Sequence, residues 1–247
     1  MDQVKVYPQR QALIEAAAED IVACAQEAIE QRGRFSIALS GGETPGPLFD
    51  RLASHAFRDR IVWGSVHVFW GDDRTVPPDH EDSNYRLAKE RLLDHVPIPP
   101  AQIHRIHTEL APELAADHYE RLLRRFFGES APDEPQPRFD YLLQGMGPDG
   151  HTASLFPHTD ALAITAASRW VVANYVPQLD TWRITLTAPA INAGRNVVFL
   201  VEGEGKAQPL YEVLKGDYRP QELPSQLIAP VDGRLVWLVD EAAAALL

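Results

Sequence analysis

The chain has 247 residues, of which 45% are hydrophobic, and a formal net charge of −12 at pH 7. This length allows one large or two small globular domains, and we expect a single domain over residues 1–247. The acidic balance excludes nucleic acid as an expected partner, because a negative surface repels the phosphate backbone.

Cys24 is the only cysteine, so no internal disulfide can form, which fits a reducing compartment. The first residues show no apolar run behind a basic start, and no stretch reaches the length needed to span a bilayer. We therefore expect a cytoplasmic protein with no signal peptide and no membrane partner.

Hydrophobic periodicity predicts strands and helices that alternate along most of the chain. Strands are predicted at residues 4–7, 34–40, 66–70, 138–144, 171–175, 183–187, 196–202 and 235–239. Helices are predicted at residues 9–31, 44–53, 83–94, 112–127, 207–215 and 241–247. The alternation indicates an α/β fold with a doubly wound, mostly parallel sheet, in which ligands bind beyond the carboxyl ends of the strands.

Two further stretches have a distinct composition. Residues 128–137 are rich in proline and polar side chains, which predicts a surface loop. Residues 103–107, Ile-His-Arg-Ile-His, alternate apolar and polar side chains as a strand does.

The segment 40–45, Ser-Gly-Gly-Glu-Thr-Pro, follows a predicted strand. Thr44 suits a helix N-cap and Pro45 the first helical position, while two glycines let the backbone approach a ligand. Free amides at a helix N-terminus attract anions, although Glu43 opposes an anion there unless its side chain faces away. A simple strand-to-helix turn fits the same pattern, so both interpretations stay open.

The next predicted strand, 66–70, is followed by Gly71, Asp72, Asp73 and Arg74. Two acids and an arginine that leave a sheet together can orient a base and bind an oxyanion or a phosphate. A solvated turn is the alternative, because Asp and Gly are common turn formers.

The most informative segment follows the strand 138–144, where a glycine-rich turn presents Asp149 and His151 two residues apart. An acid and an imidazole in a loop at the end of a strand are typical of proton transfer, so His151 is the predicted catalytic residue. The alternative is a structural histidine that caps a turn. The glycines formally match G-x-G-x-x-G, but Pro157 interrupts any following helix and residues 165–175 contain no acid, which excludes a dinucleotide site.

A metal site is another possibility for this segment, with Asp149, His151 and Asp72 as candidate ligands. His104 and His107 also lie three residues apart, but in the strand-like stretch 103–107. Zinc sites that support hydrolysis use three protein ligands in a defined cluster, and no such spacing is present. We therefore expect no metal and no other cofactor.

Lys206 follows the predicted strand 196–202 and opens a helix, where it can offer a point charge to an anion. Arg183 begins another strand and can join it. Each residue is also compatible with an ordinary surface cation. Taken together, the strand-ending loops predict a crevice that holds an anionic small molecule beside an imidazole.

In these segments the chain closely resembles the 6-phosphogluconolactonases. The string over residues 145–157 is specific to that family, and supporting matches lie at 40–45, 70–74, 83–85, 183–187, 203–206 and 237–240. The resemblance covers nearly the whole chain. It implies a modified Rossmann-like fold shared with glucosamine-6-phosphate deaminases, ribose-5-phosphate isomerases and CoA transferases. It also implies hydrolysis of 6-phospho-D-glucono-1,5-lactone, the second step of the oxidative pentose phosphate pathway.

On this hypothesis His151 takes a proton from the attacking water, and either Asp149 or Asp72 orients its ring. Arg74 and backbone amides near residues 145–150 would stabilise the oxyanion. Neither Ser40 nor Ser154 lies in G-x-S-x-G, so we expect no acyl-enzyme. The residues expected to bind substrate and its phosphate are Ser40, Gly41, Gly42, Thr44, Arg183 and Lys206.

Two positions depart from the family pattern. The family commonly has Asp-Glu-Arg where this chain has Asp72, Asp73 and Arg74, and Ser-Thr-Pro-Lys where it has residues 43–46, Glu-Thr-Pro-Gly. Rival functions are a sugar-phosphate isomerase or deaminase, and a non-catalytic sensor. The deaminases carry an acid soon after the histidine, and residues 152–157 contain none. The oligomeric state, monomer or homodimer, stays open.

Overall fold

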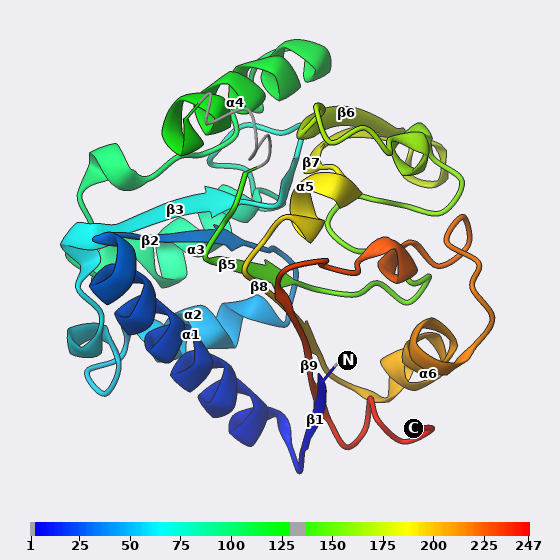
Figure 1. Ribbon diagram of the computed structural model, residues 1–247, viewed down its shortest axis with the longest axis horizontal. Coiled ribbons are helices and arrows are strands. Elements are labelled where there is room, and N and C mark those ends of the chain that lie inside the picture. Colours follow the sequence, from blue (N-terminus) through cyan, green and yellow to red (C-terminus); the bar gives the residue numbers. More distant parts are fainter. Residues whose placement is uncertain (1–2, 129–136) are drawn as a thin grey trace.

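A parallel sheet forms the centre of the computed structural model, which describes residues 3–128 and 137–247 (Figure 1). Six strands lie in the order β1-β9-β8-β5-β2-β3, and every neighbouring pair is parallel. Their bounds are β1 Gln3–Tyr7, β2 Phe35–Leu39, β3 Val66–Trp70, β5 Tyr141–Gln144, β8 Asn196–Val201 and β9 Arg234–Asp240. The predicted α/β fold with a mostly parallel sheet is confirmed, and β5 is shorter than the predicted strand at 138–144.

Three more strands, β4 Asp72–Arg74, β6 Val171–Val176 and β7 Thr181–Leu186, form a separate antiparallel sheet in the order β4-β7-β6. Periodicity predicted β6 and β7 but did not place them in a second sheet, and it missed the short, polar β4. The chain passes between the sheets at Gly71, whose N–H donates to Leu39 O at 2.9 Å and whose carbonyl accepts Leu186 N–H at 2.8 Å. Gly71 therefore fixes where Asp72 and Arg74 leave the parallel sheet.

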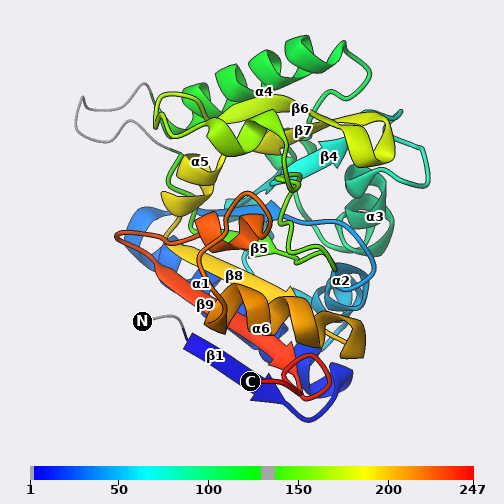
Figure 2. The ribbon, with the colours of Figure 1, turned by 90° about the vertical axis from the view of Figure 1, so that its right-hand side faces the viewer.

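Helices cover both faces of the parallel sheet. Figure 2 shows α1 on one face and α6 on the other, while α4 packs against β6 and β7. The helices are α1 Arg10–Arg32, α2 Pro45–Ala53, α3 Asn84–Arg91, α4 Pro112–Phe127, α5 Ala188–Asn192 and α6 Ala207–Lys215. The bounds of α4 and α6 match the prediction, whereas the short α5 was not predicted. No helix in the described ranges combines the length and apolar character that crossing a membrane requires.

The long helix α1 shows how the sequence sets these elements. Its buried positions, Leu13, Ala17, Ile21 and Ala28 among them, recur at helical spacing and face the sheet. The helix ends at Gly33, which adopts φ +72° and donates its N–H to Ile29 O at 2.8 Å.

Two of the predicted elements are wrong. Residues 241–247 form turns rather than a helix, because so short a segment at a chain end has too few hydrogen bonds to offset nucleation. Residues 103–107 do not form a strand; only Ile103 makes a bridge, to Val68. Most of the loop predicted at 128–137 lies outside the described residues.

His104, in the stretch 103–107, instead joins a partly buried pair with His67 of β3. His104 Nε2 lies 3.1 Å from His67 Nδ1, and both rings pack against Phe126. Burial, with the neighbouring His67, lowers the pKa of His104 to about 4, and burial with Arg34 also lowers the pKa of His67. The folded protein therefore binds fewer protons here than the unfolded chain between about pH 6.5 and 4.

We predict that stability falls as the pH falls through this window, because the unfolded chain takes up the extra proton. His104→Gln keeps a hydrogen-bonding group but cannot ionise. Its free energy of unfolding should therefore fall less between pH 7 and pH 4 than that of the wild-type protein, by about 1–2 kcal/mol. This difference is smaller than the full pKa shift corresponds to, because solvent screens the partly exposed ring. Urea unfolding at several pH values measures the difference. If the exposed His55→Gln variant reduced the pH dependence of stability by the same amount, the effect could not be assigned to His104.

Candidate active site

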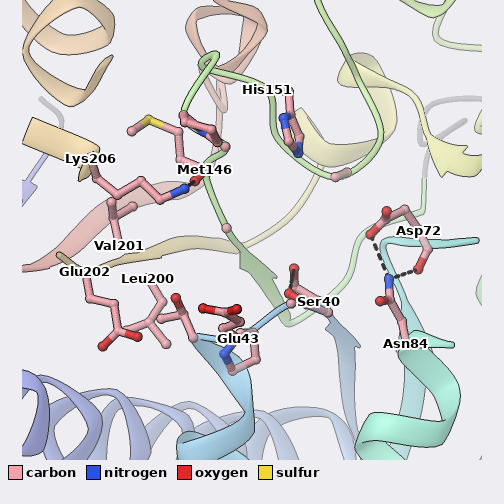
Figure 3. Close-up of a pocket in the computed structure, with 18 of the residues that line it drawn as sticks. Ser40, Glu43, Asp72, Asn84, Met146, His151, Leu200, Val201, Glu202 and Lys206 are labelled. Carbon is pink, nitrogen blue, oxygen red and sulfur yellow. Dashed lines mark hydrogen bonds between the residues drawn. The ribbon is translucent and has the colours of Figure 1, made fainter. Parts of the chain in front are cut away.

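A cavity of about 340 Å³ lies beyond the carboxyl ends of four adjacent parallel strands (Figure 3). This volume is at the lower end of the range for small-molecule sites, roughly 300–1,000 Å³. Eight of the predicted site residues line it: Ser40, Gly41, Gly42, Thr44, Asp72, Arg74, His151 and Lys206. The loops that sequence separates by up to 166 positions thus meet at one edge of the sheet, as parallel strands require.

The turn after β5 holds the acid and the imidazole together. Gly147 N–H donates to His151 O at 2.8 Å, and Gly150, at φ +74°, donates to Gly147 O at 3.1 Å. This closure places Asp149 Oδ1 at 2.5 Å from His151 Nδ1, while the ring stacks on Phe156 at 4.0 Å between centroids. A Cβ on Gly147 would lie 2.1 Å from Nδ1, so only glycine fits there.

This contact defines the roles that the two side chains can play. Burial alone would raise the pKa of Asp149, but its hydrogen bonds with His151 and the charge of that ring bring the pKa below its ordinary value. A carboxylate that accepts Nδ1–H leaves the lone pair on Nε2, and no group of the described residues bonds that nitrogen. His151 is thus set up to accept a proton at Nε2.

Asp72 does not contact His151, so the acid that orients the ring is Asp149. One oxygen of Asp72 accepts the Ser154 hydroxyl at 2.5 Å, and the other lies 3.4 Å from Asn84 Nδ2. Asp72 is only 6% exposed, and Figure 3 shows it on the opposite side of the cavity from Lys206.

Asp73, the departure from the family pattern, has a structural position. Its carboxylate accepts the backbone N–H groups of Asn84 at 2.8 Å and Tyr85 at 3.2 Å, at the N-terminus of α3. Burial raises the pKa of Asp73 to about 6, against the opposing effect of these hydrogen bonds. Asp73 therefore ties α3 to β4 and does not line the cavity.

Sequence reasoning placed Asn84 at a helix start and in the segment 83–85 that matches the family, but it missed the place of this residue in the cavity wall. The Asn84 side chain is 2% exposed and packs so closely on Gly41 that a Cβ there would lie 1.7 Å from Oδ1. A polar residue at the first position of a helix, directly after a Ser N-cap, was the available signal, but helix starts of this kind are common.

Two cations that line the cavity, Arg74 and Lys206, have no acidic partner among the described residues and come from different parts of the fold. Arg74 lies on β4 and donates to Asp82 O at 2.6 Å, and Lys206, just before α6, donates to Met146 O at 2.7 Å. Within residues 3–128 and 137–247 neither forms an ion pair with a carboxylate. Burial lowers the pKa of Lys206, while the charges of Asp149 and Glu43 partly oppose this shift.

Arg183 is not beside Lys206, contrary to our expectation of one shared phosphate site. It pairs across β4 and β7 with Arg74 and does not line the cavity. Burial, followed by the charge of Arg74, lowers the pKa of Arg183. Positive charge is therefore concentrated at two separate places, Lys206 and the Arg74–Arg183 pair.

The turn before α2 has the predicted position but not the predicted cap. Pro45 begins the helix, but Thr44 has helical backbone angles, φ −68° and ψ −40°, and its side chain makes no capping hydrogen bond. Gly42 adopts φ +92°, which lets the turn close. Glu43 lines the cavity rather than facing away, and Glu202, bound to Arg10, lines it as well.

The candidate metal ligands do not come together. Asp149 bonds to His151, whereas Asp72 is bound to Ser154 and Asn84. In the described ranges no group of three or more His, Cys, Asp or Glu side chains is arranged to hold a metal ion.

A doubly wound sheet with an acid–imidazole pair and unpaired cations at its carboxyl edge defines an enzyme-type site for a small anionic ligand. Residues 8–237 match the family model described as glucosamine-6-phosphate isomerases/6-phosphogluconolactonase, and the chain belongs to this family.

Comparisons with individual proteins agree with this assignment. A 6-phosphogluconolactonase of Synechocystis sp. is 46% identical over 98% of this chain and 96% of its own. The solved 6-phosphogluconolactonase from Trypanosoma cruzi is 27% identical, with a TM-score of 0.86 over 99% of this chain and 96% of its own. A monomeric glucosamine-6-phosphate deaminase, 17% identical with a TM-score of 0.82 over 99% of this chain and 100% of its own, shares the fold.

We predict that Gly147→Ala displaces the His151 ring, because the added methyl group overlaps Nδ1. The Nδ1–H proton shared with Asp149 should disappear from the low-field NMR spectrum, and overpacking should lower the free energy of unfolding by about 1–3 kcal/mol. Gly64→Ala, where a Cβ meets nothing within 4 Å, is the control. A low-field signal that survives in Gly147→Ala would rule out the close contact.

Proposed function

We propose that this protein hydrolyses 6-phospho-D-glucono-1,5-lactone to 6-phospho-D-gluconate, the second step of the oxidative pentose phosphate pathway. The observation that carries the proposal is the 2.5 Å contact between Asp149 and His151, on a cavity that also holds two unpaired cations. The full-length relative and the solved structure that bear the name 6-phosphogluconolactonase support the same substrate.

In the proposed reaction His151 Nε2 takes a proton from a water as the water oxygen bonds to C1 of the lactone. Asp149 stabilises the imidazolium that forms. When the tetrahedral intermediate collapses, the bond between C1 and the ring oxygen breaks, and the imidazolium returns its proton to that oxygen. The products are a carboxylic acid, which ionises in water, and a free hydroxyl group.

The oxyanion of the intermediate needs hydrogen-bond donors that are not already in use. The amides of Gly147 and Gly150 are bonded inside the turn, so they do not serve, although we expected donors from this segment. Arg74 lines the cavity and has no acidic partner in the described residues, and we assign it this role. Donors of this kind typically contribute roughly 10²–10³-fold to the rate.

The phosphate is assigned to Lys206 and the turn formed by residues 40–44, which line the cavity together. Amides at the start of α2 favour an anion, whereas Glu43 opposes it, so Lys206 supplies the compensating charge. Arg183 adds positive charge behind Arg74. Contacts to the phosphate, which is remote from C1, position the lactone ring. These contacts need not change between the bound substrate and the transition state.

A direct attack by water fits the two serines better than an acyl-enzyme does. Ser154 is 1% exposed and its hydroxyl is committed to Asp72, so it is not accessible to an ester. Ser40 is 8% exposed and donates weakly to Gly41 O at 3.5 Å, with no base bonded to it in the described residues.

The remaining parts of the proposal concern the whole protein. Residues 1–247 act as one catalytic domain in the cytoplasm, with a sugar phosphate as the small-molecule partner. The reaction uses no metal or other cofactor, and it involves neither nucleic acid nor a membrane.

We predict that His151→Gln lowers kcat by roughly 10²–10⁴-fold with little change in fold, because the variant has no general base. Acid release from freshly generated phosphogluconolactone, corrected for spontaneous hydrolysis and run with and without a chelator, measures this. His158→Asn, an exposed histidine in the same loop, is the control and should keep the wild-type rate. Turnover near the wild-type rate in His151→Gln would refute the assignment.

We also predict that Lys206→Met raises KM for the phosphorylated lactone roughly 10–100-fold, because a charged hydrogen bond to the phosphate is lost. Glucono-1,5-lactone without phosphate should show no comparable change. The exposed Lys215→Met variant, at the last residue of α6, tests for a nonspecific charge effect. Equal KM increases with both substrates would place the phosphate elsewhere.

A further inference from the structure

Ser154 belongs to the same loop as His151 and connects that loop to the second sheet. Its hydroxyl donates to Asp72 Oδ2 at 2.5 Å, across 82 positions of sequence. Its main chain is held as well, because Ser154 N–H donates to Thr185 Oγ1 at 3.2 Å and Ser154 O accepts Asn174 Nδ2 at 2.8 Å. Ser154, Thr185 and Asn174 are all at most 2% exposed.

Asp72 is fixed from its other side by Asn84. The Nδ2 of Asn84 donates to Asp72 O at 2.9 Å and lies 3.4 Å from Asp72 Oδ1, as the dashed lines in Figure 3 show. The amide has only this orientation, because a flipped oxygen would face two acceptors. Asn84 in turn packs on Gly41 and is held by Asp73 through its backbone N–H.

The His151 loop is thus attached at two places, one to the parallel sheet and one to the second sheet. Thr152 donates to Gln144 Oε1 at 2.9 Å, which holds the start of the loop to the end of β5. Ser154 holds the following turn to β4, where Asp72 and Arg74 lie. The main-chain bonds of Ser154 join the turn to β6 and β7, and the Ser154 hydroxyl is the bond that joins it to β4. The distance between His151, in the loop after β5, and Arg74 on β4 therefore depends in part on the bond between Ser154 and Asp72.

We propose that Ser154 is a positioning residue for the reaction, and that its hydrogen bond to Asp72 sets the placement of the His151 ring relative to Arg74. The inference deepens the proposed lactone hydrolysis and rests on it. Asp72 acts here as the acceptor that holds the loop, since both of its oxygens are occupied. Losing a bond of this kind misplaces the base by a fraction of an ångström to an ångström, which typically costs up to 10²-fold in rate.

The test compares two serine-to-alanine variants that remove the same atoms. Ser154→Ala loses the bond to Asp72, whereas Ser225 is equally buried, at 1% exposed, and its hydroxyl has no partner among the described residues. Ser225 also contacts the same turn, through its N–H to Gly150 O at 2.9 Å. We expect Ser154→Ala to lower kcat roughly 10–100-fold with KM within about twofold, and Ser225→Ala to keep both values within about twofold.

A double-mutant cycle separates positioning from a general loss of stability. Because Ser154 and Asp72 act through one bond, Ser154→Ala combined with Asp72→Asn should be no slower than the slower single variant. Reductions in kcat that multiply, or a Ser154→Ala variant that behaves like Ser225→Ala, would overturn the proposal. Thermal unfolding of each variant shows whether it is folded at the assay temperature.

An imidazole NMR spectrum provides a readout that needs no lactone. In Ser154→Ala the signals of the His151 ring should shift or double, and in Ser225→Ala they should superimpose on those of the wild-type protein. Unchanged His151 signals in folded Ser154→Ala would overturn the positioning role. A wild-type protein without lactonase activity would instead refute the proposed function, so the two failures are distinguishable.

Discussion

Parallel pairing of β8, β5, β2 and β3 is the constraint on which the rest of the site depends. Because all four strands run the same way, the loops that follow them emerge at one edge. Those loops carry Lys206, the His151 turn, the turn at residues 40–44, and the passage through Gly71 to Asp72. A cation, an imidazole and a glycine-rich turn therefore surround one cavity without any of them being close in sequence.

The second sheet gives this edge its other wall. Gly71 bonds to Leu39 on one side and to Leu186 on the other, so β4 begins where β3 ends. Asp72 and Arg74 are thereby turned toward the cavity, and Arg183 is brought next to Arg74 by the β4–β7 register. Since two positive side chains then lie together, the cavity has one cationic region here and another at Lys206.

Local sequence patterns predicted most of the elements, and the failures have physical reasons. The bounds of α4 and α6 follow from periodic apolar residues, whereas β4 consists of Asp72, Asp73 and Arg74 and has no apolar signal. Its strand conformation comes from pairing with β7. Thr44 has a residue type and position that suit an N-cap, but its backbone is already helical, which no local preference reveals.

The sequence by itself determined the central α/β sheet, the glycine turn with Asp149 and His151, and the family to which the chain belongs, because these depend on local spacing and residue type. Only the tertiary structure decided that Asp149 rather than Asp72 meets His151, that Arg183 joins Arg74 rather than Lys206, and that Ser154 bonds to Asp72. The contact between Asp149 and His151 is local, but Asp72 lies away from the ring because it belongs to β4 and bonds to Ser154. The other two contacts join residues on different strands and loops, so they exist only after the sheets have formed and the register of each pair is fixed.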